Sequence, residues 1–237
     1  RDDLPKKGRA RGADAGTGEP LLPAALEGAL HSLYSNYEKA FAQWEDTRAG
    51  ETGATPPVFI VVCNNTTVSK MVFDHVAGWS KPLADAPEEA DGVWVPGRLP
   101  LFSNVVDGRL AGRATTILVD SSQLESGEGM SDEFKRLAAT EIAEFKQEYA
   151  DRFPGRDAAD LTDEDLLREV MNTVGKAGKL GEHVRCVVSV SMLTEGWDAN
   201  TVTHILGVRA FGTQLLCEQV VGRGLRRRSY AVDEATG

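Results

Sequence analysis

Cysteine is scarce in this chain of 237 residues. The three cysteines, Cys63, Cys186 and Cys217, are far apart, and none lies in a Cys-x-x-Cys pair or at a zinc-ligand spacing from a histidine. The sequence therefore predicts neither a disulfide framework nor a cysteine zinc site. Cys63 and Cys186 lie inside apolar runs, which predicts buried, reduced thiols.

Long apolar runs are also missing. No stretch approaches the roughly 20 residues that a membrane-spanning helix needs. The chain begins at Arg1 without a methionine or a charged-then-apolar leader, and it ends in a polar run. We therefore expect a cytoplasmic protein without a membrane partner, and a segment of a longer polypeptide.

Positive charge is in deficit over the whole chain, whose formal net charge is −10. This balance argues against a generally basic surface for nucleic acid. The distribution is uneven, because residues 125–169 carry 14 acidic and 6 basic side chains, whereas residues 209–228 carry 5 arginines and one glutamate. A local positive edge on an acidic body fits the binding of phosphates at one face.

Apolar patterning predicts an α/β fold. Hydrophobic residues make up 41% of the chain, enough for a substantial core. Unbroken or β-branched apolar runs suit strands buried on both faces, and spacings of three and four suit helices between them. This alternation predicts a mainly parallel sheet flanked by helices. The expected strands are 58–63, 115–120, 184–190 and 203–208, and the expected helices are 22–47, 66 to about 76, 131 to about 153, and 162–174.

Two stretches are expected to lie outside this pattern. Residues 1–20 are rich in glycine, alanine and charge, which predicts a flexible linker before a domain over 21–237. Residues 80–113 are rich in proline, glycine and acid, which predicts an irregular insertion with one short strand at 93–95. An acidic helical region is expected at about 125–175.

Asn64, Asn65 and Thr66 follow the first predicted strand and begin a predicted helix. Ligands of open α/β sheets bind at the carboxyl ends of strands, and a helix N-terminus there can hold a phosphate. These three residues are therefore candidates for contact with a phosphate backbone. Simple helix capping explains them equally well.

Other polar groups have structural interpretations. Thr162 and Asp165 have the spacing of a capping box, which we favour over a catalytic role for the acids at 163–165. Residues 175–179, GKAGK, fail the spacing of a phosphate-binding loop and follow a helix. His75 is expected to be a packed or surface histidine.

The chemistry is expected in residues 191–228, SMLTEGWDANTVTHILGVRAFGTQLLCEQVVGRGLRRR. Gly196 lets the backbone approach a ligand closely, and Asp198 can accept hydrogen bonds from a ribose. A last helix is expected after the strand at 203–208, and its Gln219, Arg223 and Arg226 are spaced i, i+4 and i+7, so they share one helical face. Such a face suits a polyanion, most naturally a nucleoside triphosphate.

These residues resemble motifs of a known family. Residues 219–226, QVVGRGLR, resemble the Q-x-x-G-R-x-x-R motif VI of superfamily 2 (DEAD/DEAH-like) helicases, and residues 194–198, TEGWD, resemble motif V. The strand at 58–63 with the asparagines after it lies where motif IV belongs. Residues 186–227 are most similar to the helicase subunit of type III restriction enzymes, with a looser likeness from Val58 onward.

The resemblance implies a RecA-like fold and a role for each matched residue. Arg223 and Arg226 would be arginine fingers that reach ATP bound on a partner domain, and Gln219 would help to orient that site. The nucleotide would contact Glu195, Gly196 and Asp198. The nucleic-acid backbone would contact Ser191 and Thr194, together with Asn64, Asn65 and Thr66.

The chain has no G-x-x-x-x-G-K-[ST] loop and no D-E-x-[HD] box. In the family these belong to the first RecA-like domain, which holds ATP and Mg²⁺. The resemblance therefore implies the second RecA-like domain alone, with the first domain of the same parent chain, DNA, and a methyltransferase or specificity subunit as partners. It would not hydrolyse ATP by itself. A non-catalytic RecA-like module that docks DNA or protein remains the alternative, and a doubly wound transferase is a weaker one.

Overall fold

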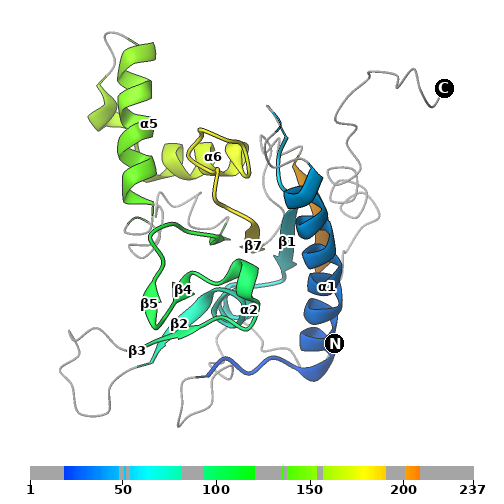
Figure 1. The fold of residues 1–237 in the computed structure, drawn as a ribbon. Coiled ribbons are helices and arrows are strands. Elements are labelled where there is room, and N and C mark those ends of the chain that lie inside the picture. The colour runs from blue at the N-terminus through cyan, green and yellow to red at the C-terminus, as the bar shows by residue number, and fades with distance from the viewer. Residues whose placement is uncertain are drawn as a thin grey trace, which may run out of the picture.

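The computed structural model describes residues 19–47, 51, 54–81, 93–120, 135, 138–153, 157–190 and 201–208. At its centre is a four-stranded sheet in the order β6-β7-β1-β8, in which every neighbouring pair is parallel (Figure 1). These strands are β1 (Val58–Cys63), β6 (Thr116–Asp120), β7 (Cys186–Val190) and β8 (Val202–Gly207). Every residue of β1 and β7 is buried, as the unbroken apolar sequence of β1 and the mainly apolar sequence of β7 predict. The α/β class with a parallel sheet is confirmed.

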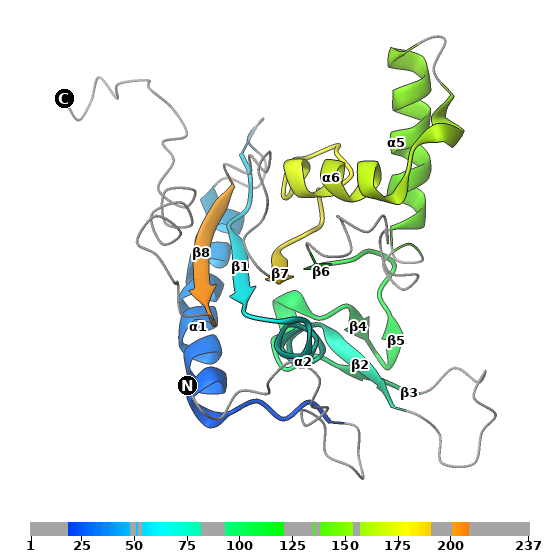
Figure 2. The same cartoon turned by 180° about the vertical axis from the view of Figure 1, so that it is seen from behind.

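One face of the sheet is covered by α1 (Ala24–Thr47) and α2 (Thr66–Ala77). Phe59, Val61 and Cys63 of β1 point into this core. Tyr37 of α1 is fully buried there, and its hydroxyl donates to the carbonyl oxygen of Pro57 at 3.0 Å. The turned view shows α1 lying along β8 and β1 (Figure 2).

The opposite face is covered by α6 (Asp163–Thr173), with α5 (Ala139–Arg152) packed more loosely beyond it. Val58, Ile60 and Val62 of β1 point into this second core. The alternate residues of one strand therefore serve two cores, which is the period of two that a strand imposes. A short 3₁₀ turn, η2 (Ala158–Asp160), joins the two helices.

The segment between α2 and β6 is more regular than its composition predicts. It contains two antiparallel pairs of short strands and a 3₁₀ turn, instead of one strand in an irregular insertion. Asp107 and Gly108 both have positive φ, which is the geometry of a tight hairpin turn. The elements are β2 (Gly78–Lys81), β3 (Val93–Pro96), η1 (Pro100–Phe102), β4 (Val105–Val106) and β5 (Arg109–Leu110).

Among the described residues, no helix has the length and apolar character needed to cross a bilayer. The longest, α1, places charged residues along its exposed side.

Candidate functional site

The carboxyl ends of three strands are level with one another. Val190, the last residue of β7, is in register with Cys63 of β1 on one side and with Asp120 of β6 on the other. Gly207 of β8 is in register with Val62. Because all four strands are parallel, the segments that follow them leave from a single edge of the sheet, which we call the carboxyl edge.

The connections leave this edge in opposite directions. The chain after β1 enters α2 on one face, whereas the helices between β6 and β7 pack on the other face. These two connections flank β7, the strand that lies between β6 and β1. Ligands of open α/β sheets bind at the carboxyl ends of the strands, at the point where successive connections diverge in this way.

Asn64, Asn65 and Thr66 lie at the carboxyl edge, as expected. Asn65 is the N-cap of α2, and its side-chain oxygen accepts a hydrogen bond from the backbone N–H of Val68 at 2.9 Å. Asn64 and Thr66 are exposed. The capping interpretation therefore holds for Asn65, while the exposed neighbours flank a helix N-terminus that can accept a phosphate.

Ser191 directly follows Val190, the last residue of β7, and residues 194–198, which resemble motif V, come shortly after it in the sequence. The other candidate residues at 194–198 and 219–226 come later in the sequence. Outside the described residues lie Ser191, Thr194, Glu195, Gly196, Asp198, Gln219, Arg223 and Arg226.

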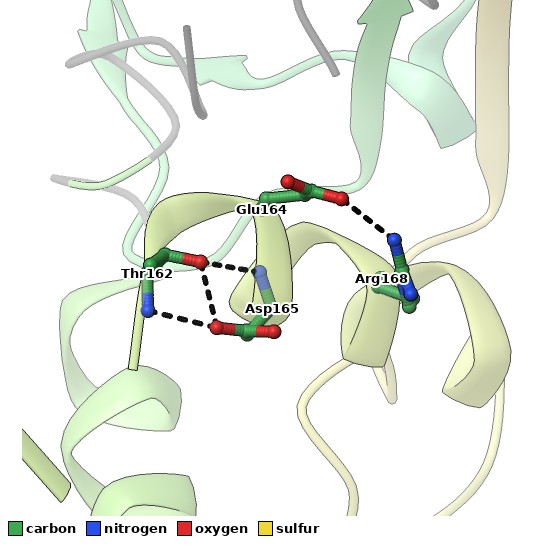
Figure 3. A network of polar contacts seen from close by, with 4 residues as sticks. All are labelled: Thr162, Glu164, Asp165 and Arg168. Carbon is green, nitrogen blue, oxygen red and sulfur yellow. Dashed lines mark hydrogen bonds and ion pairs between the residues drawn. The ribbon is translucent and has the colours of Figure 1, made fainter. Parts of the chain in front are cut away.

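The acids at 163–165 form the start of α6, as the capping interpretation predicts. The Thr162 hydroxyl accepts from the backbone N–H of Asp165 at 3.2 Å, and the Asp165 carboxylate accepts from the backbone N–H of Thr162 at 3.0 Å (Figure 3). Hydrogen bonds from the Thr162 side chain and backbone lower the pKa of Asp165. Glu164 forms an ion pair with Arg168 at 2.6 Å. These contacts account for Asp165 and Glu164 without catalysis.

The GKAGK turn is not a phosphate-binding loop. The backbone N–H of Gly178 donates to the carboxylate of Glu182 at 2.8 Å, so an anion of the protein already occupies this turn. Lys176 donates to the carbonyl oxygen of Asn172 at 2.8 Å, and Lys179 forms an ion pair with Glu148 at 2.6 Å. Both ammonium groups therefore contact other groups of the protein.

Cys63 and Cys186 are free thiols buried in the sheet. Burial raises the pKa of the Cys63 thiol to about 12 and raises the pKa of Cys186 further. Both side chains are therefore protonated at neutral pH, which excludes them as nucleophiles or metal ligands in this state. The third cysteine, Cys217, lies outside the described residues.

Comparisons with models of protein families, with curated proteins and with solved structures found no match to this chain. The functional argument therefore depends on the residues and on their arrangement.

The structure also brings together three side chains that the sequence does not group. Glu27 and His31 of α1 meet His75 of α2. The sequence predicts both helices, but it gives no signal for the contact between them. The i, i+4 spacing of Glu27 and His31 is the one local hint.

Proposed function

We propose that this chain is the second RecA-like motor domain of a superfamily 2 DNA helicase or translocase, similar to the helicase subunit of type III restriction enzymes. The observation that carries the proposal is the level register of Cys63, Val190 and Asp120 at the carboxyl edge. Because β7 pairs with β1, the strand that precedes the motif V-like residues 194–198 ends beside the strand of the motif IV-like segment. This arrangement of the two strands supports the proposal.

In this proposal the carboxyl edge is one wall of an ATPase site. Arg223 and Arg226, on one face of the last predicted helix, stabilise the charge that develops on the transferred phosphoryl group. Gln219 orients that face, and Gly196 with Asp198 contacts the nucleotide. ATP and Mg²⁺ are held by a first RecA-like domain, because this chain has no phosphate-binding loop of the required pattern.

The DNA track is proposed for the same edge. Asn64 and Thr66 are exposed beside the N-terminus of α2, where backbone N–H groups and the helix dipole favour a phosphate. Ser191 and Thr194 follow β7 in the sequence, and β7 pairs with β1, the strand before Asn64. Closure of the two domains around ATP would then move this wall along duplex DNA.

The arginine finger is tested by Arg226→Ala in the parent polypeptide that contains both domains. We expect the DNA-stimulated ATPase rate to fall by roughly 10³-fold or more, since a finger contributes that much to phosphoryl transfer. The matched control is Arg168→Ala, which removes only the exposed ion pair of α6 with Glu164 and should leave the rate unchanged. Steady-state phosphate release is the measurement.

The isolated chain should show no measurable ATPase. Substantial ATP turnover by the isolated chain would contradict the proposal that it supplies only one wall of the ATPase site. An unchanged rate in Arg226→Ala would show that Arg226 is not an arginine finger. DNA binding that persists while the parent hydrolyses no ATP would instead favour a docking module without catalysis.

A further inference from the structure

The contact between α1 and α2 contains a compact group of metal-ligand side chains. Glu27 and His31 are one helical turn apart on α1, and His75 lies in the last turn of α2. One carboxylate oxygen and two ring nitrogens, one from each residue, all lie within 4.8 Å of one another. The imidazole rings of His31 and His75 meet edge to face, with centroids 5.9 Å apart.

His75 also has an unsatisfied ring nitrogen. Its side chain is only 4% exposed, and its Nε2 atom is buried without a hydrogen-bond partner in the described part of the chain. Buried polar atoms are almost always paired, because leaving one unpaired loses the hydrogen bonds that water would supply. A packed histidine with no further role leaves this nitrogen unexplained, whereas a coordinate bond would satisfy it.

Burial lowers the pKa of His75, and the neighbouring carboxylate of Glu27 opposes this effect. The nearby charges of Arg98 and Glu19 form an ion pair with each other and offset one another at the cluster.

The chemistry of the three ligands selects the ion. Two imidazoles and one carboxylate form a common protein site for Zn²⁺, which leaves a fourth tetrahedral position for water. Hard ions such as Mg²⁺ prefer oxygen ligands alone. Zn–ligand bonds of about 2.0–2.1 Å place ligand atoms roughly 3.3 Å apart in a tetrahedron. Glu27 and His31 are exposed, so their side chains can rotate to close the remaining distance.

We propose that Glu27, His31 and His75 form a Zn²⁺ site that ties α1 to α2. The two ligands on α1 approach from the solvent side, and His75 holds the ion against the core. The site is independent of the carboxyl-edge chemistry, so its presence or absence does not bear on the proposed motor function.

Zn²⁺ titration of the whole chain by calorimetry, with millimolar Mg²⁺ present, tests the site. We expect one Zn²⁺ per chain in the wild type and a loss of affinity of at least about tenfold in both Glu27→Gln and His31→Ala. These two residues are exposed, so their variants should fold. A 100-fold excess of free Zn²⁺ over its dissociation constant should raise the wild-type melting temperature by roughly 5–10 °C.

His183→Ala is the matched control, because this substitution also removes one imidazole. His183 contacts Arg113 and is far from the proposed ligands in the sequence. Cys217→Ser controls for zinc capture by the remaining cysteine. Both should bind Zn²⁺ as the wild type does. The proposal would be overturned by no binding in the wild type, by unchanged affinity in His31→Ala and Glu27→Gln, or by an equal loss in His183→Ala.

Discussion

Three consecutive residues at the start of α2 differ in what their side chains contact. The Asn65 side chain caps the helix through the backbone N–H of Val68, whereas Asn64 and Thr66 are exposed. The capping signal was predictable, since it depends on residues only three positions apart. The same is true of Thr162 and Asp165 in α6. In contrast, no local pattern could bring His75 to Glu27, because two separate helices must first pack on the sheet.

Asn65→Ala should lower the free energy of unfolding by about 1 kcal/mol, the usual value of a lost N-cap. Asn64→Ala, one residue away and exposed, should change it by less than about 0.5 kcal/mol. Urea unfolding followed by circular dichroism gives both values. Equal destabilisation by the two substitutions would contradict the different roles of the two side chains.

At the scale of elements, the apolar runs predicted the strands well. The expected strand over 58–63 is β1 residue for residue, and the other three agree to within two residues at either end. Their order in the sheet was not predictable, because it depends on pairing between distant segments. The short strands β4 and β5 were missed, although the dipeptide Asp107-Gly108 between them is a hairpin signal. The proline, glycine and acidic residues of 80–113 had instead predicted an irregular insertion.

Asn104 connects this inserted segment to the sheet. Its side-chain oxygen accepts from the backbone N–H groups of Thr115 and Thr116, both at 2.9 Å, and its amide donates to the carbonyl oxygen of Thr116 at 2.8 Å. Thr116 begins β6, which is an edge strand of the described sheet. A buried side chain thus satisfies backbone groups that an edge strand would otherwise leave unpaired.

Asn104→Ala should lower the free energy of unfolding by about 3 kcal/mol or more, because it leaves several buried backbone groups without partners. The control is Gln43→Ala on the exposed side of α1, which should change it by less than about 0.5 kcal/mol. Chemical denaturation of the two variants in parallel makes the comparison. A loss below about 1 kcal/mol in Asn104→Ala would show that the segment is held by its apolar contacts instead.

At the scale of the whole molecule, the parallel sheet and the uneven charge of the sequence support the proposal that one face binds phosphates. The net charge of −10 disfavours the binding of nucleic acid by the chain as a whole. The five arginines of residues 209–228 make this one segment positively charged. The sheet carries the exposed Asn64 and Thr66 at its carboxyl edge, where the segment beginning at Ser191 also starts. The proposed binding of DNA by so acidic a protein should therefore use few phosphate contacts and depend on particular arginines.

Arg227→Ala tests whether the basic run after the predicted helix contacts DNA phosphates or is only solvated. If Arg227 contacts a phosphate, the slope of log affinity against log salt concentration for duplex DNA should become shallower by about 1, because one fewer counterion is released on binding. Arg109→Ala, an exposed arginine of β5, should leave the slope unchanged. Fluorescence anisotropy between about 50 and 200 mM salt measures both. An equal change of slope in the two variants would mean that DNA affinity depends only on the total charge of the protein. An unchanged slope in Arg227→Ala would mean that Arg227 is solvated and contacts no phosphate.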